Sequence, residues 1–173
     1  MDNLLSRVRA EQDVFKRLAA YVPGFRGYVD RQNRRAAEKL LRETVARQFE
    51  DLWKRLSSFQ VELVQRKQIE LMDEVERAAL QLRTFADRIK TASYGYSGFF
   101  DAIKIDSTEL ERLYQYDLAF FELAKEIQQA LDMLENVIND PAALSQSISQ
   151  LTALATQANQ LLDHRQEVVL QGG

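Results

Sequence analysis

Apolar residues recur at alternating steps of three and four positions along most of this chain, which is the spacing of one face of a helix. Residues that break helices gather at four places: 23–27, 95–98, Pro141 and the two terminal glycines. Between these places the pattern predicts one short helix and three long ones. Their predicted ranges are about 3–20, 30–92, 107–139 and 141–169.

The longest predicted helix carries two heptad seams, which are apolar stripes of the kind that pack helices side by side. The two seams meet between Leu63 and Leu71, where the interval is one residue longer than strict heptads allow. Such a slip in phase bends a helix or alters its supercoiling. We expect the helix either to run unbroken or to break near 57–66, with the Ser57-Ser58 pair as its weakest point.

The residues before the two later helices have the chemistry of helix starts. Asp106 with Glu109 forms the capping-box pattern, and Asp140 before Pro141 suits the first turn of the next helix. The aromatic segment 94–100 predicts a packed loop. The sequence has no strand signal of useful length. We therefore predict an all-α fold in a single domain, either an antiparallel helical bundle or a long coiled-coil-like helical hairpin, with a short N-terminal helix.

The amino-acid composition limits the cellular compartments in which we expect this helical chain. It has no cysteine, which excludes disulfides and thiolate metal sites. No run of about 18 apolar residues occurs, and charged residues interrupt the N-terminus, so the sequence predicts neither a membrane-spanning helix nor a signal peptide. We expect a cytoplasmic protein, with any membrane contact being peripheral.

The net charge of −3 conceals an uneven distribution. Residues 1–60 carry 13 Lys and Arg against 8 Asp and Glu, a net +5, whereas residues 61–173 carry 10 against 18, a net −8. A basic N-terminal third suits contact with phosphate or acidic lipid. We favour pairing with the acidic remainder of the bundle, or with a neighbouring copy of the chain.

Basic residues are densest around and after the turn at 21–28, and we call this set the basic stripe. Most of its cations would share one helical face, which is typical of segments that bind anionic membranes or nucleic acid. Acidic neighbours four residues away, in the pairs Glu38 with Arg42 and Lys39 with Glu43, favour an ordinary solvated face instead. The candidate interaction residues of the stripe and its turn are Phe25, Arg26, Tyr28, Arg31, Arg34, Arg35, Lys39 and Arg42.

Asp117 occupies an apolar position of a predicted seam, with Tyr114 close by. A buried carboxylate needs hydrogen-bond donors, because an unpaired charge in the core is costly. We favour a polar residue that fixes the register of the helices, paired with a tyrosine hydroxyl or an arginine. Arg165 lies on the last seam and is a mate for Asp117 if these two helices pack antiparallel. The alternative is a contact with a ligand or partner.

The single histidine, His164, offers little chemistry. A zinc site would need further His or Cys ligands, and a di-iron carboxylate bundle needs Glu-x-x-His on two helices. Phosphate-binding loops, dinucleotide-binding glycine patterns and nucleophile elbows are also missing from the sequence. We predict no catalytic residue, no cofactor and no metal.

Two stretches of the chain resemble a family of small uncharacterised bacterial all-helical proteins. One is the turn Tyr21-Val-Pro-Gly-Phe-Arg-Gly-Tyr28 with Arg34-Arg35 and Leu40-Leu41-Arg42 after it, and the other runs from Ile105 to Leu118. The resemblance covers roughly two-thirds of the chain. Members of the family are often encoded beside band-7/SPFH-type membrane-scaffold proteins, so the resemblance implies a membrane-proximal partner. It implies no activity and no catalytic residue.

These features together predict a non-enzymatic helical scaffold or adaptor that acts through protein-protein contacts. Apolar seams left uncovered within the chain would be covered by a second copy or by a partner helix. One alternative is a binder of anionic membranes or nucleic acid through the basic stripe, although nucleic acid is not the favoured partner. Another is a small-ligand or metal-binding bundle, although no small-molecule substrate is indicated.

Overall fold

The structure is a computed structural model that describes residues 2–30, 33–92 and 107–171. No described residue lies in a strand, which confirms the all-α prediction. None of the helices in these ranges is long and apolar enough to cross a membrane. The elements in chain order are α1 (Asp2–Tyr21), α2 (Phe25–Asp30), α3 (Arg34–Gln65), the 3₁₀ helix η1 (Ile69–Leu71), α4 (Met72–Thr91), α6 (Ser107–Asn136) and α7 (Pro141–Gln171).

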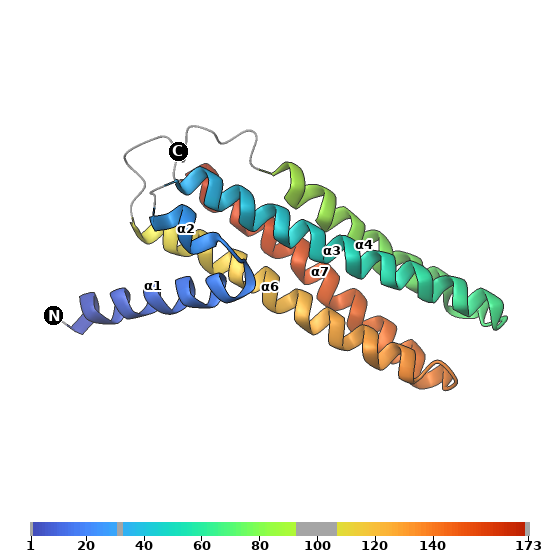
Figure 1. The fold of residues 1–173 in the computed structure, drawn as a ribbon. Coiled ribbons are helices and arrows are strands. Elements are labelled where there is room, and N and C mark those ends of the chain that lie inside the picture. The colour runs from blue at the N-terminus through green and yellow to red at the C-terminus, as the bar shows by residue number, and fades with distance from the viewer. Residues whose placement is uncertain (1, 31–32, 93–106, 172–173) are drawn as a thin grey trace.

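Four long helices form an antiparallel bundle, the first of the two predicted architectures (Figure 1). Helices α3 and α4 make one hairpin, and α6 and α7 make the other. The hairpins lie side by side, with α3 against α6 and α4 against α7. Outside the bundle, α1 packs on α6 and α2 packs on α3, at the end away from the two hairpin turns.

The predicted helix 30–92 is broken, but not at the two serines. Ser57 and Ser58 lie inside α3, where each hydroxyl donates to the carbonyl four residues earlier and so stays compatible with the helix. The chain turns instead at residues 66–68, within the interval where the two seams fall out of phase. The prediction of a break at Ser57-Ser58 is therefore wrong.

The turn after α3 is a Schellman motif built on a lysine. Lys67 has a φ of 62°, in the left-handed region that glycine usually occupies at this position. The Gln68 N–H donates to the Leu63 carbonyl at 2.9 Å, and the Lys67 N–H donates to the Val64 carbonyl at 3.0 Å. This turn contains neither glycine nor proline, so no helix-breaking residue marks it in the sequence.

Turns at the other helix ends follow the sequence more closely. Gly24 has a φ of +88° in the turn that follows α1, where the Phe25 N–H donates to the Val22 carbonyl at 3.2 Å. The residues after it form the short helix α2, where only a turn was predicted. Asp140 caps α7, since its Oδ1 accepts from the Ala143 N–H at 3.3 Å. The capping box at Asp106 and Glu109 and the aromatic segment 94–100 lie outside the described residues and side chains.

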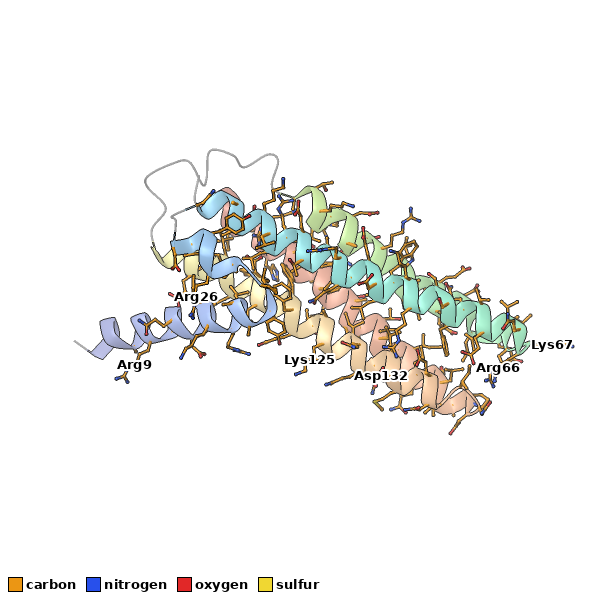
Figure 2. The ribbon with its side chains drawn as sticks, in the orientation of Figure 1. Arg9, Arg26, Arg66, Lys67, Lys125 and Asp132 are labelled. Atoms are coloured by element: carbon orange, nitrogen blue, oxygen red, sulfur yellow. The ribbon has the colours of Figure 1, made fainter. Side chains whose placement is uncertain are left out.

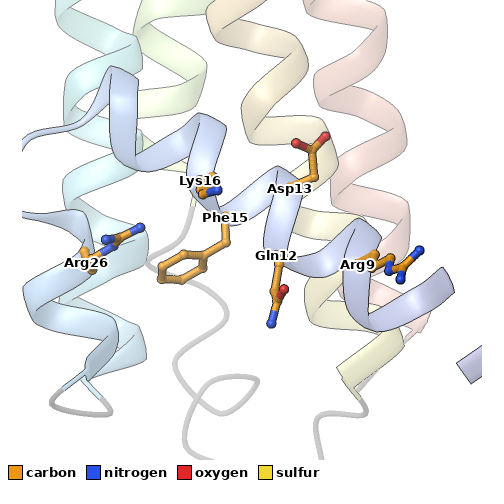
Figure 3. A pocket seen from close by; sticks show the side chains of 6 residues that line it. All are labelled: Arg9, Gln12, Asp13, Phe15, Lys16 and Arg26. Atoms are coloured by element: carbon orange, nitrogen blue, oxygen red, sulfur yellow. The ribbon is translucent and has the colours of Figure 1, made fainter. Parts of the chain in front are cut away.

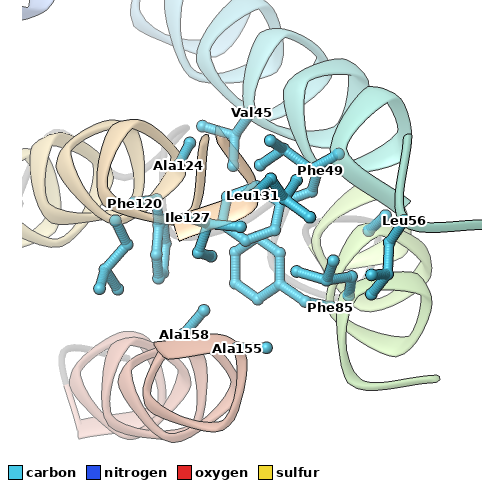
Figure 4. Close-up of a cluster of buried hydrophobic side chains, with 14 of the residues drawn as sticks. Val45, Phe49, Leu56, Phe85, Phe120, Ala124, Ile127, Leu131, Ala155 and Ala158 are labelled. Carbon is cyan, nitrogen blue, oxygen red and sulfur yellow. The ribbon is translucent and has the colours of Figure 1, made fainter. Parts of the chain in front are cut away.

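Aromatic rings fill the middle of the bundle (Figure 4). The ring centroids of Phe49 on α3 and Phe85 on α4 are 4.1 Å apart, and Phe120 on α6 lies 5.1 Å from Phe85. Helix α7 presents the small residues Ala155 and Ala158 to this cluster. Large side chains on three helices therefore meet small ones on the fourth, which is how a core reaches close packing.

Replacing Phe85 by alanine tests this core. We expect Phe85→Ala to lower the free energy of unfolding by about 3–5 kcal/mol, because the fully buried ring leaves a cavity bordered by other aromatic rings. The control is Leu80→Ala on the same helix, where the side chain is 62% exposed. The control should change stability by less than about 0.5 kcal/mol in urea unfolding. Equal losses in the two variants would contradict this account of the core.

Candidate functional site

A buried cluster of four charged side chains joins the bundle near the end where α3 begins. Glu38 and Arg42 come from α3, Asp117 from α6 and Arg165 from α7, and each residue is at most 6% exposed. The Arg165 Nε lies 3.0 Å from the Asp117 Oδ1, and its Nη2 lies 3.7 Å from the Glu38 Oε1. The antiparallel packing thus brings Asp117 and Arg165 together.

Arg42 extends the cluster to the fourth helix. Its Nε donates to the Glu38 Oε1 at 2.9 Å, and its Nη1 donates to the backbone carbonyl of Lys90 on α4 at 2.7 Å. The two guanidinium groups balance the two carboxylates, so the cluster is neutral when all four are ionised. Charges taken out of water at such cost are tolerated because each has an opposite partner.

Burial dominates the titration of the two carboxyl groups in this cluster. It raises the pKa of Asp117, and the charge and hydrogen bond of Arg165, with a smaller effect of Arg42, act in the opposite direction. Burial also raises the pKa of Glu38, against the charges of Arg42 and Arg165. Asp117 is a second, smaller cause of the rise at Glu38, since two nearby carboxylates repel.

The cluster has the properties of a structural element. Its side chains are buried and their charged groups bind one another, which leaves no open position for a substrate or ion at Asp117. This argues against the alternative of a small-ligand or metal-binding bundle centred there. Tyr114 is half-buried at the edge of this region, and its ring meets that of Phe25 edge-on at 5.7 Å.

Two of the described members of the basic stripe and its turn, Phe25 and Arg42, are buried rather than exposed. Phe25 is fully buried, with its ring 5.1 Å from that of Phe15, so it is not an exposed aromatic anchor. Arg42 is buried in the ionic cluster, which also means that the pair of Glu38 with Arg42 does not lie on a solvated face. Both expectations of exposure were wrong because of how the helices pack. Phe25 on α2 is covered by aromatic rings of α1 and α6, and Arg42 on α3 bonds to the backbone of α4.

Other members of the basic stripe have mixed environments. Lys39 is exposed, and its Nζ lies 3.9 Å from the Glu43 carboxylate, the pairing that the sequence suggested. Tyr28 is half-buried and Arg26 is exposed. Arg31 and the side chains of Arg34 and Arg35 lie outside the described residues and side chains.

Tertiary structure makes a different cationic site, which we call the α1–α2 groove (Figure 3). Arg26 on α2 here joins Arg9 and Lys16, which lie two turns apart on α1. The groove has a volume of about 550 Å³ and is open to solvent. Its lining residues are Arg9, Gln12, Asp13, Phe15, Lys16 and Arg26. Figure 2 shows how Arg9 and Arg26 extend from the outer helices.

A second surface lies on the outside of the α6–α7 hairpin, and we call it the α6–α7 groove. It encloses about 440 Å³, and its apolar residues are Ala130, Met133, Ala153 and Leu154. The rest of its lining is three glutamines, at 129, 150 and 157, together with Glu126. The predictions from the sequence did not include this surface, although residues 141–162 contain no charged side chain, which is a signal of it.

Among the described residues, no group of three or more His, Cys, Asp or Glu side chains is placed to hold a metal ion. His164 is exposed on α7. The absence of catalytic residues, cofactors and metals stays a prediction from the sequence.

Comparison with known proteins adds no family to this picture. No protein-family model matches the chain, and no curated protein or solved structure matches it either. The resemblance to helical proteins encoded beside band-7/SPFH membrane scaffolds therefore rests on the sequence motifs alone. The geometry of the two grooves and of the ionic cluster has to support any functional proposal.

The ionic cluster leads to a prediction about pH. Arg165→Met removes the guanidinium that lowers the pKa values of Asp117 and Glu38, so both should lie further above their unfolded values. A carboxyl with a raised pKa in the folded chain binds a proton on folding. Its contribution to stability is present at low pH and is lost as the pH rises through the folded pKa. We expect the deficit of the variant to grow between about pH 4 and pH 7, reaching about 3–5 kcal/mol.

The measurement is the free energy of unfolding in urea at several pH values, for the variant and the wild type. Arg83→Met is the control, since Arg83 forms an exposed pair with Asp87. Its deficit should stay below about 1 kcal/mol with little pH dependence. A deficit of Arg165→Met that is constant across this pH range would show that the carboxyl groups do not respond as described.

Proposed function

We propose that the protein is a non-enzymatic helical scaffold that works through protein-protein contact, and that its first partner is a second copy of the same chain. The contact surface in this proposal is the α6–α7 groove. The observation that carries the proposal is the chemistry of that surface, which combines an exposed methionine with small apolar residues and uncharged glutamines. Enzymatic function has no comparable support among the described side chains.

Charge is the first argument for a contact surface. Charged residues make up 28% of the chain, yet none occurs in the 22 positions from Pro141 to Leu162. The cores of protein interfaces are depleted in charged residues and enriched in methionine. On the facing helix α6, Met133 is 56% exposed and lines the groove. A face with few charges costs less to desolvate than a charged one when another protein covers it.

The shape of the groove fits a helix. Ala130 and Ala153 on its two walls have short side chains, which let another helix approach closely, while Leu154 and Met133 provide apolar contact. Glutamines along its edges are able to hydrogen-bond to one another across an interface. A helical hairpin packed on this groove would extend the bundle with the same kind of contacts that hold α6 against α7.

A second copy is the occupant we favour, because of how symmetric dimers form. In a two-fold dimer the same patch lies on both sides of the interface, so it must be complementary to itself. A charged patch would repel its own copy, whereas this one contains a single carboxylate, Glu126. A strongly charged partner would instead leave its own charges unpaired against the groove. The resemblance to proteins encoded beside membrane scaffolds further suggests that such an assembly works near a membrane.

Light scattering on the purified 173-residue chain tests this proposal. The wild type should show a mass of twice 20.0 kDa, and the double variant Met133→Glu with Leu154→Glu should be monomeric, because carboxylates would then be buried against their copies. The control is Leu80→Glu on α4, which adds a charge away from the groove at a site whose exposure is similar to that of Met133. It should remain dimeric.

Two results would count against the proposal. One is a wild type that stays monomeric at every concentration measured. The other is equal dissociation of the Leu80→Glu control, which would mean that added charge alone disrupts association. Circular dichroism of each variant shows whether the helices remain folded, so that a change in mass reports on the interface.

A further inference from the structure

The α1–α2 groove gathers positive charge from two helices that are separated by a turn. Arg9 and Lys16 are seven residues apart on α1, which places them on one side of the helix and roughly 10 Å apart along its axis. Arg26 comes from the short helix α2 and lies on the other side of the groove (Figure 3). Phe15 lies between the cationic residues of the two helices and supplies an apolar wall.

Arginines at two other helix contacts have carboxylate partners. Arg17, also on α1, pairs with Glu122 of α6, and Arg88 of α4 pairs with Asp163 of α7. No carboxylate among the described residues forms an ion pair with any of the three cations in the groove.

Asp13 is the one acid in the lining of the groove. Figure 3 shows its carboxylate on the opposite side of α1 from Gln12 and Phe15. The lining residues include three cations and one acid, so the groove has a local charge of +2, whereas the net charge of the chain is −3.

We propose that the α1–α2 groove binds phosphate groups, carried by an anionic phospholipid headgroup or by a small soluble phosphate compound. Arginine guanidinium groups match phosphate oxygens with paired hydrogen bonds, and a lysine adds a compact charge. The Gln12 side chain is a neutral donor beside them. The spacing between Arg9 and Lys16 suits a ligand with two phosphate groups, or two neighbouring headgroups, better than a single ion.

The charge distribution argues against nucleic acid as the ligand. A nucleic acid strand needs a basic track that follows several successive phosphates. Here the cationic region is a short groove, and the chain from residue 61 onward carries a net charge of −8. That acidic remainder would repel a long polyanion lying along the bundle. A compact phosphate ligand, or a membrane surface touched only by α1 and α2, avoids this repulsion.

Binding of the 173-residue chain to three probes tests the proposal. The probes are inorganic pyrophosphate, vesicles of phosphatidylcholine mixed with phosphatidylserine, and a single-stranded oligonucleotide, with pure phosphatidylcholine vesicles as the blank. The test variant is Arg26→Glu, and the matched control is Arg77→Glu. Arg77 is an exposed cation on α4 without an ion pair among the described residues, so both variants change the net charge equally.

We expect Arg26→Glu to weaken binding by about fivefold or more, since a cation near an anionic surface contributes about 1 kcal/mol and 1.4 kcal/mol corresponds to tenfold. Arg77→Glu should change binding less than twofold, and binding should weaken with added salt. Binding of the mixed vesicles alone would identify a lipid headgroup as the source of the phosphate. Binding of pyrophosphate without the vesicles would identify a soluble compound.

Three results would overturn the proposal. The first is that neither pyrophosphate nor the mixed vesicles bind. The second is that Arg77→Glu weakens binding as much as Arg26→Glu, which would reduce the effect to net charge. The third is that the oligonucleotide binds more tightly than both other probes and that the Arg26→Glu variant no longer binds it. The double variant Met133→Glu with Leu154→Glu should retain the binding, because its two sites lie on α6 and α7, outside the α1–α2 groove.

Discussion

Burial of two carboxylates with two guanidinium groups constrains the arrangement of all four long helices. Arg165 contacts both Asp117 and Glu38, and Arg42 joins Glu38 to the backbone of α4. Shifting any one helix along its axis would separate a charge from its partner inside the core, at a cost of several kcal/mol. We therefore interpret the cluster as the element that fixes the helix register, whereas the aromatic core supplies apolar burial without comparable directionality.

The ionic cluster and the two grooves are three separate polar or charged regions of the molecule. The ionic cluster is neutral and closed, the α6–α7 groove is exposed and nearly free of charge, and the α1–α2 groove is exposed and cationic. Contact with a second copy and binding of phosphate would therefore use separate faces of one rigid bundle. Such a separation is what a scaffold needs if both are to occur at the same time.

Local sequence chemistry explains which boundaries could be predicted. Gly24 lies just after the end of α1 and adopts a positive φ, which glycine does easily. Asp140 lies at the start of α7, where its carboxylate accepts a backbone hydrogen bond. The turn at Lys67 is different, because a lysine there adopts the left-handed conformation only within hydrogen bonds made by the end of α3. In the sequence, the slip in the apolar period indicated the region of this turn but did not identify Lys67 as its residue.

By itself the sequence determined the helical class and the packing faces, and it indicated that Asp117 and Arg165 are buried, because apolar period and the cost of isolated buried charge act locally. Tertiary structure alone decided which residues are accessible. It buried Phe25 and Arg42, which had been placed on a surface, and brought Arg26 from α2 beside Arg9 and Lys16 from α1. Whether a side chain is exposed, and which charges of separate helices come together, depends on how those helices pack. The spacing of residues within one helix does not say which other helix will cover it.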